Sequence, residues 1–112
     1  MGRLTTHVLN TATGLPAEGM QVTLRKLDGD GQSVRLSDRV TNRDGRVDTP
    51  LLDGTAFTAG TYELIFFVGD YFQSKDGFLD EVPIRFTVHD DTRHYHVPLL
   101  VTPFGYTTYR GS

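Results

Sequence analysis

Apolar and polar residues alternate with a period of two along most of the chain, and clusters of Gly, Asp, Asn and Pro interrupt the alternation. This pattern is typical of β-strands that have one buried and one exposed face. Met20, Val22 and Leu24, for example, share one face, opposite Gln21 and Thr23. Seven or eight such segments predict an all-β sandwich that forms a single domain over residues 1–112. The predicted strands are residues 4–11, 20–25, 33–41, 46–52, 62–68, 82–88, 94–101 and 106–110.

The segment 62–68 is the most apolar part of the chain and is apolar on both of its faces. Ile65 and Phe67 lie opposite the face that carries Leu64 and Phe66. A strand that is apolar on both faces is usually buried on both. In a small sandwich, only the inner face of a sheet is covered by the other sheet. We therefore expect a second subunit to cover the outer face, which carries Ile65 and Phe67.

One short helix is predicted directly after this segment. Asp70 and Gln73 have the spacing of a capping box, with Asp70 at the N-cap and Gln73 three residues later. Gly77 is suited to end the helix after about two turns, because glycine readily adopts the left-handed conformation found there. We therefore expect one helix between these residues.

Composition and charge exclude several classes of protein. The 112 residues have a formal net charge of −3 with both signs interspersed, so we expect no nucleic-acid partner. The chain contains no Cys, which excludes a disulfide framework and a thiolate metal site. No apolar run approaches the roughly 20 residues of a membrane span, and residues 1–5 enter a strand pattern without a signal peptide. We therefore expect a cytoplasmic protein without a membrane partner.

Two histidines are predicted to lie on the outer surface of the sandwich. In residues 94–101 the uniformly apolar or aromatic face contains Tyr95 and Val97, so His96 points away from the core. The alternation of residues 4–9 places His7 outward in the same way. Outward imidazoles on separate strands can converge in a groove and act as general bases near neutral pH. Taken alone, each also fits a solvated surface residue without a role.

Two arginines stand at positions that suit substrate binding. Arg46 follows the turn residues Asp44 and Gly45 at the expected start of a strand, a rigid place from which to direct a guanidinium. Arg110 belongs to the C-terminal segment Tyr109–Ser112, and its planar donor group suits flat anionic acceptors. An ordinary surface charge beside a turn, or an edge charge that opposes aggregation, is the alternative for each. We expect this C-terminal segment to enter a site.

The spacing of the histidines also allows a zinc site. His94 and His96 lie two residues apart on one strand face and could both bind zinc, with His89 or His7 as a further ligand. Nothing else in the sequence marks a metal site, and neither a phosphate-binding loop nor a serine nucleophile motif is present. We therefore expect neither a metal nor another cofactor.

Several separated motifs resemble the transthyretin-like 5-hydroxyisourate hydrolases of urate degradation. The C-terminal Tyr-Arg-Gly-Ser is the most specific of these motifs, and the Gly-Leu-Pro-Ala segment is also similar to transthyretin itself. Together the motifs extend over nearly the whole chain. They are residues 6–10, 14–17, 41–46, 94–101 and 103–112.

The resemblance implies a transthyretin-like sandwich, a homotetramer built as a dimer of dimers, and active sites at the interface between dimers. It also implies hydrolysis of 5-hydroxyisourate to 2-oxo-4-hydroxy-4-carboxy-5-ureidoimidazoline. The family's catalytic positions correspond to His7, Arg46 and His96, and its substrate-binding positions to Tyr109, Arg110, Gly111 and Ser112. Which histidine is the general base stays open. The alternative function is that of a non-catalytic carrier which binds a small aromatic ligand in a central channel.

Overall fold

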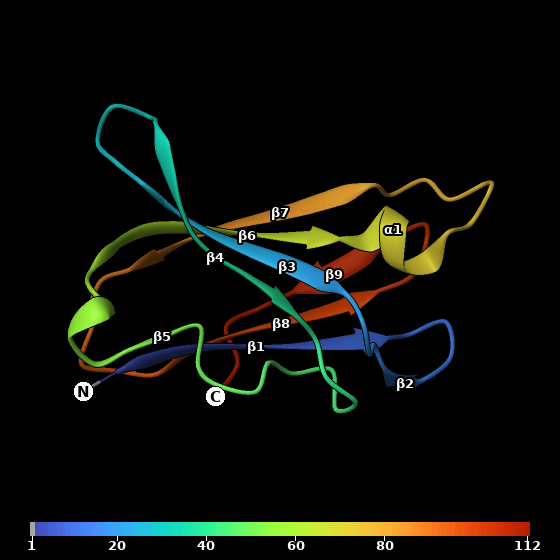
Figure 1. Cartoon of the computed structure of the whole chain (residues 1–112), viewed down its shortest axis with the longest axis horizontal. Helices are drawn as coiled ribbons and strands as arrows, with labels where there is room; N and C mark the ends of the chain where they lie inside the picture. The colour runs from blue at the N-terminus through green and yellow to red at the C-terminus, as the bar shows by residue number, and fades with distance from the viewer. Residues whose placement is uncertain (1) are drawn as a thin grey trace.

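The computed structural model describes residues 2–112, which form two β-sheets packed face to face (Figure 1). One sheet has the order β2-β1-β8-β9, with β5 also paired to β1, and the other has the order β4-β3-β6-β7. The predicted β-sandwich is therefore confirmed. Its strands are β1 (Arg3–Asn10), β2 (Leu15–Pro16), β3 (Gln21–Leu27), β4 (Ser33–Val40), β5 (Leu52–Asp53), β6 (Gly60–Phe67), β7 (Glu81–Val88), β8 (Tyr95–Val101) and β9 (Tyr106–Thr108).

The alternation of the sequence produces the core directly. Tyr62, Leu64 and Phe66 of β6 are fully buried between the sheets, whereas Ile65 and Phe67 on the other face of β6 are half-buried. Burying one large apolar side chain contributes roughly 1.5–3 kcal/mol, so this face fixes the register of the strand. The remaining fully buried large side chains come from both sheets and from the segments next to them: Leu4, Val8, Met20, Val22, Leu24, Leu99, Val68, Val82 and Val88.

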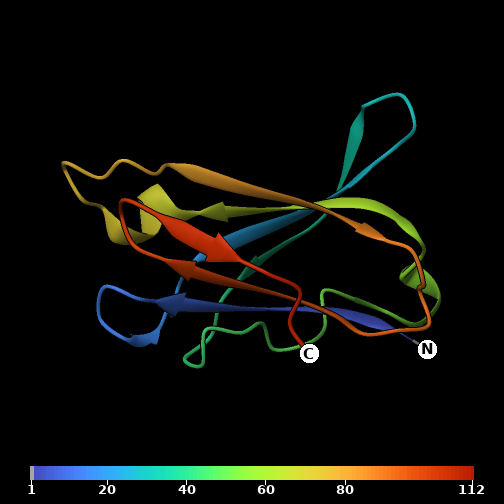
Figure 2. The same ribbon diagram turned by 180° about the vertical axis from the view of Figure 1, so that it is seen from behind.

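Strands β1 and β8 lie side by side and parallel (Figure 2), and they carry His7 and His96. All other pairs among the described strands are antiparallel. The hydroxyl of Thr6 donates a buried hydrogen bond of 2.7 Å to the carbonyl of Val97, which ties the two strands together on their inner side. In this register Thr5 is paired with His96 and His7 with Pro98.

The predicted strand over residues 46–52 is wrong for most of its length. Only its two ends pair with β1, Arg46 through an isolated bridge to His7 and Leu52 as part of the short strand β5. Residues 47–51 form a loop, in which Pro50 has no N–H to donate to a strand ladder. The Arg39 guanidinium instead holds this loop by donating to the backbone carbonyls of Thr49 and Pro50.

The predicted helix exists, but its boundaries and its capping box are wrong. Helix α1 (Val68–Phe72) begins before Asp70, has no side-chain cap, and follows β6 directly. The Gly69 N–H still donates to the carbonyl of Asp80, so the β6–β7 pairing continues into the first turn. Gln73, with φ of 51°, ends the helix in the left-handed conformation four residues before Gly77. A short 3₁₀ turn, η1 (Gly54–Ala56), follows β5.

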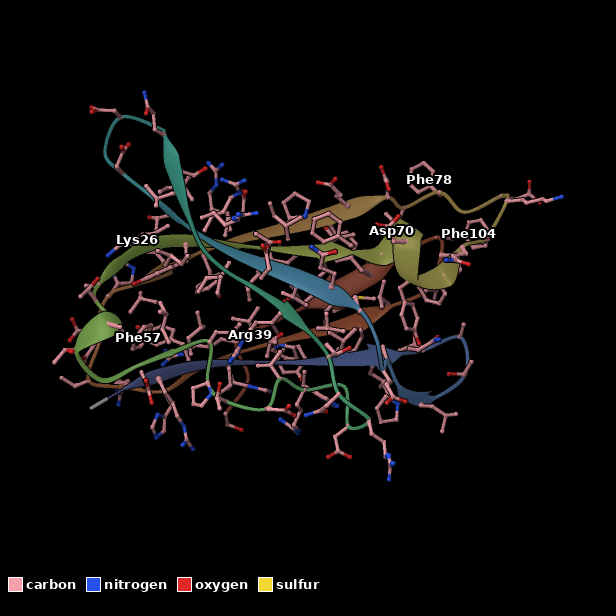
Figure 3. The ribbon with its side chains drawn as sticks, viewed as in Figure 1. Lys26, Arg39, Phe57, Asp70, Phe78 and Phe104 are labelled. Atoms are coloured by element: carbon pink, nitrogen blue, oxygen red, sulfur yellow. The ribbon has the colours of Figure 1, made fainter. Side chains whose placement is uncertain are left out.

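Exposed apolar side chains lie at one end of the sandwich. Phe78 and Phe104 are 78% and 62% exposed and lie close together there (Figure 3). Their loops are joined, because the N–H groups of Phe78 and Leu79 both donate to the carbonyl of Pro103. No helix among residues 2–112 is long and apolar enough to cross a membrane.

Candidate active site

His7 and His96 both lie on the outer face of the β1–β8 pair, as the alternation predicted. Their neighbours Thr6, Val8, Tyr95 and Val97 are buried, whereas both imidazoles are partly exposed. Because the two strands run parallel and adjacent, residues that are 89 positions apart in the sequence share one small area of surface. Two groups that can accept or donate a proton are therefore brought together outside the core.

The turn at residues 42–46 holds Arg46 beside His7. The Asn42 side-chain oxygen accepts hydrogen bonds from the backbone N–H groups of Asp44 and Arg46, at 2.9 and 3.1 Å. Gly45 has φ of 73°, and its carbonyl accepts a 2.8 Å bond from the N–H of Val8. A Cβ on Gly45 would lie 2.4 Å from the Val8 carbonyl oxygen, so only glycine fits this close approach. The turn is thereby fastened to β1, and Arg46 bridges to His7.

Burial and positive charge keep both imidazoles neutral. The pKa of His7 lies below its ordinary value of 6.5, first because of burial and second because of the Arg46 guanidinium, while Asp44 acts in the opposite direction. The pKa of His96 is lowered by burial, by Arg46 and by His7, in that order. At neutral pH the two rings can therefore accept a proton, and Arg46 is close enough to both to stabilise negative charge.

The C-terminal segment places Gly111 against His96. The Gly111 N–H donates a 2.8 Å bond to the His96 carbonyl, and the two residues form an isolated antiparallel bridge. A Cβ on Gly111 would lie 2.5 Å from Cδ2 of the imidazole, so the ring packs directly on the glycine. Tyr109 and Ser112 are exposed. The segment thus lies against His96 through Gly111.

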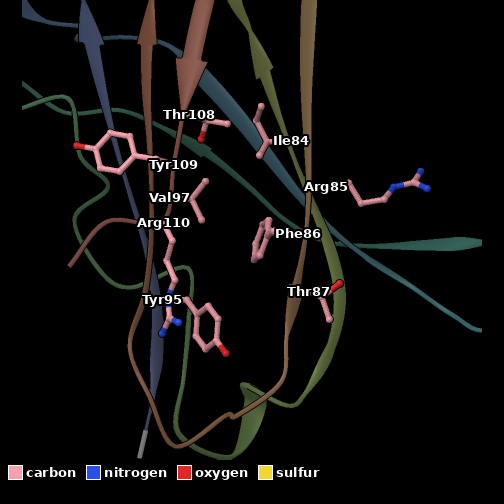
Figure 4. Close-up of a pocket in the computed structure, with 9 residues that line it drawn as sticks. All are labelled: Ile84, Arg85, Phe86, Thr87, Tyr95, Val97, Thr108, Tyr109 and Arg110. Carbon is pink, nitrogen blue, oxygen red and sulfur yellow. The ribbon is translucent and has the colours of Figure 1, made fainter.

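Arg110 lies at the open edge between the sheets, where it lines a cavity together with Tyr95 and Val97 (Figure 4). Its guanidinium carbon lies 4.1 Å from the centre of the Tyr95 ring, and its Nη2 donates to the His94 carbonyl at 3.2 Å. The surrounding cavity of about 210 Å³ is also lined by Ile84 and Phe86 of β7. The alternation of extended backbone explains this: neighbouring residues face opposite sides, and Gly111 is the one beside His96.

Thr5 is a residue of this area that the sequence did not single out. Its side-chain oxygen lies 2.8 Å from Nδ1 of His96, within hydrogen-bond distance. The only sequence signal is that Thr5 shares the outward face of its strand with His7. The contact itself depends on the pairing of strands that are distant in the sequence.

The alternative zinc site receives no support from the arrangement of side chains. Within residues 2–112 no group of three or more His, Cys, Asp and Glu residues is close enough to hold a metal ion. His94 is exposed and its backbone carbonyl is the acceptor for Arg110. Two imidazoles with lowered pKa values next to one guanidinium are suited to proton transfer.

Comparison with known proteins finds relatives that match almost the whole chain. The 5-hydroxyisourate hydrolase 2 of Rhizobium meliloti is 53% identical over 117 residues, which cover 99% of this chain and 97% of the relative. The solved structure of Klebsiella pneumoniae 5-hydroxyisourate hydrolase is similar with a TM-score of 0.83, 35% identity and complete coverage of both chains. Sea bream transthyretin in complex with thyroxine is similar with a TM-score of 0.89 and 28% identity, over 97% of this chain and 94% of that one. The model of the HIUase/Transthyretin family matches residues 4–111, and the chain belongs to this family.

Proposed function

We propose that this protein hydrolyses 5-hydroxyisourate to 2-oxo-4-hydroxy-4-carboxy-5-ureidoimidazoline. The observation that carries the proposal is the cluster of His7, His96 and Arg46 on the outer face of the β1–β8 pair, with both imidazoles neutral. The relatives named 5-hydroxyisourate hydrolase, at about half identity over almost the whole chain, support the same reaction.

In the proposed reaction a water molecule attacks a ring carbonyl of the substrate. His7 and His96 position the water and take up its proton as the C–O bond forms. The adjacent C–N bond then breaks, the carbonyl carbon becomes a carboxyl group, and the proton passes to the leaving nitrogen. Arg46 stabilises the negative charge that develops on the carbonyl oxygen, because a guanidinium offers fixed donors to an anionic group. The steps require only these side chains and water.

The segment Tyr109–Ser112 is the proposed substrate-binding element. Gly111 supports this role because it packs against the His96 ring and leaves no space for a side chain between them. Tyr109 and Ser112 are exposed and available to a ligand. Arg110 contacts a substrate in this proposal only when its guanidinium leaves the Tyr95 ring over which it is stacked.

Assembly into a homotetramer belongs to the same proposal. The histidine cluster lies on an open sheet face, and a neighbouring subunit that covers it would exclude water and strengthen the electrostatic interactions within the site. The half-buried Ile65 and Phe67 supply a second apolar face for subunit contact. We propose a cytoplasmic location, which a chain without Cys residues suits.

The alternative is a carrier that binds a small aromatic ligand without changing it. A carrier has no need for two neutral imidazoles next to a guanidinium, which favours the hydrolase. Carbon NMR of 5-hydroxyisourate, freshly generated from urate, distinguishes the two functions. A hydrolase accelerates the appearance of the new carboxylate carbon at far less than one protein per substrate. A carrier leaves the rate of ring opening unchanged and shifts substrate signals only in proportion to its own concentration.

A further inference from the structure

His96 is held from two sides by contacts that belong to different parts of the chain. On the β1 side, Nδ1 of its ring lies 2.8 Å from the Thr5 hydroxyl oxygen. On the other side, Cδ2 of the ring packs against Gly111, where an added Cβ would come within 2.5 Å. Nδ1 and Cδ2 are the two ring atoms bonded to Cγ, so both flanks of the imidazole are occupied by protein. The His96 side chain is partly exposed, and among residues 2–112 its ring is hydrogen-bonded through Nδ1, not Nε2.

We propose that Thr5 is a positioning residue, which fixes the ring orientation and the tautomer of His96 so that Nε2 is the nitrogen that reacts. This inference rests on the proposed hydrolysis for its kinetic consequence, but the fixed tautomer is a property of the protein alone. A hydroxyl can donate to an unprotonated Nδ1 or accept from a protonated one. In a neutral imidazole the first case places the proton on Nε2, and the second leaves Nε2 unprotonated.

The backbone around Thr5 makes it suitable for this role. Thr5 and His96 are direct partners in the parallel β1–β8 pairing. The backbone hydrogen bonds between the two strands therefore fix the relative position of the two residues. The branched side chain of threonine has few rotamers in a strand, which holds the hydroxyl near Nδ1 at little entropic cost. The neighbouring Thr6 bonds Val97 on the inner face, which prevents the register from slipping.

Gly111 restricts the ring on its second flank. The bond from its N–H to the His96 carbonyl keeps the C-terminal segment in place, and the absence of a side chain lets the Cδ2 edge of the imidazole pack against it. Rotation of the ring by a half turn about the Cβ–Cγ bond would remove Nδ1 from Thr5 and leave the hydroxyl without this partner. The two contacts together therefore select one ring orientation.

The test compares Thr5→Val with Thr5→Ser in the full-length protein. Valine keeps the branched shape and removes the hydroxyl, whereas serine keeps the hydroxyl. We expect Thr5→Val to lower kcat roughly ten- to a hundredfold with little change in KM, the scale for misplacing a reacting group, and Thr5→Ser to stay close to the parent. Thr61→Val is the matched control, because Thr61 lies in the other sheet, far from the histidine cluster along the fold, and its hydroxyl pairs there with the Thr87 hydroxyl at 3.4 Å. Thr5→Ala replaces Thr5→Val if the latter does not fold.

Nitrogen NMR of the histidine rings at neutral pH gives a readout that does not need activity. We expect His96 to occupy one tautomer in the parent and in Thr5→Ser, and a mixture of tautomers in Thr5→Val. The tautomer found also identifies whether Nε2 accepts or donates a proton. An unchanged tautomer together with unchanged kcat in Thr5→Val would overturn the inference. If the parent did not hydrolyse 5-hydroxyisourate, the proposed function would fail, while the NMR comparison would still decide the role of Thr5.

Discussion

At the scale of single residues, the site depends on keeping two imidazoles uncharged beside a guanidinium. Burial is the largest cause of the lowered pKa of both His7 and His96, and Arg46 is the next. The same guanidinium that holds the rings neutral is available to the oxygen that becomes negative during hydrolysis. The position of Arg46 beside His7 and His96 therefore serves two purposes: it lowers the pKa of the two bases, and it provides a positive group for the developing oxyanion.

Replacing either histidine is expected to remove activity without unfolding the protein. His7→Asn and His96→Asn should each lower kcat on the order of a hundredfold or more, the scale of a lost general acid–base group. Both side chains lie on the outer face, so thermal melting should change little. Initial rates of 5-hydroxyisourate decay and melting curves check this. His89→Asn is the control, since His89 lies in the loop after β7. Unfolding of His96→Asn would assign that residue a structural role instead.

The lowered pKa values predict how rate and stability depend on pH. Protonation removes the base, so kcat/KM should stay constant around neutral pH and fall only at a pH below 6.5, the ordinary histidine value. The folded state binds these protons less readily than the unfolded chain does. The stability contribution of the two groups is therefore present above 6.5 and is lost as the pH falls toward their folded pKa values. Rate and melting profiles between pH 5 and 8 test this, and an acidic limb centred above 6.5 would contradict it.

At the scale of elements, the sequence predicted the strands better than it predicted their partners. Alternation correctly indicated β1, β3, β4, β6, β7 and β8, and all of these except β4 bury side chains in a common core. It failed for residues 46–52, which form a loop for most of their length. Pro50 cannot donate to a strand ladder there, and Arg39 binds the backbone of the loop. It also failed at the start of α1, because the β6–β7 pairing through Gly69 overrides the local capping preference of Asp70.

The candidate site could be predicted only in part for a related reason. The outward direction of His7 and His96 follows from alternation within one strand, and that prediction is correct. The hydrogen bond between Thr5 and His96 joins residues 91 positions apart, and it exists only in the parallel register of β1 and β8. No local pattern carries that information. Arg110 illustrates the same limit, since its direction depends on how Gly111 pairs with His96.

A methyl group at Gly111 tests the contact between the C-terminal segment and the site. Gly111→Ala should lower kcat roughly tenfold or more, because the added carbon must displace the His96 ring from its position. Gly105→Ala is the matched control, since an added Cβ there meets nothing within 4 Å and Gly105 has no positive φ. Initial rates and melting temperatures of both variants check the prediction. Equal activity in the two would mean that the segment does not constrain His96.

At the scale of the whole molecule, the sandwich keeps part of its apolar surface outside the core. Ile65 and Phe67 are half-buried on the outer face of β6, and Phe78 and Phe104 are exposed at one end. The histidine cluster likewise lies on an outer face. A single subunit therefore carries reactive groups on a partly exposed surface, and a neighbouring subunit is the direct way to enclose them.

Assembly is expected to be required for activity. Sedimentation at micromolar concentration should give the mass of a tetramer, and Phe67→Glu should weaken association because a buried carboxylate at an apolar contact is unfavourable. Activity should decline in parallel with the fraction of assembled protein. Glu18→Gln, an exposed change in the loop before β3, is the control. A fully active monomer would contradict the account of an enclosed site.

The most direct test of the central claim is ultraviolet monitoring of 5-hydroxyisourate, freshly generated from urate, with and without this protein. The account predicts that a catalytic amount of protein accelerates the decay well beyond the spontaneous rate, with and without a metal chelator. It also predicts that the doubly substituted His7→Asn, His96→Asn protein, confirmed to be folded by its melting curve, returns the decay to near the spontaneous rate. Decay at the spontaneous rate in the presence of the parent protein would contradict the hydrolase account and favour a carrier.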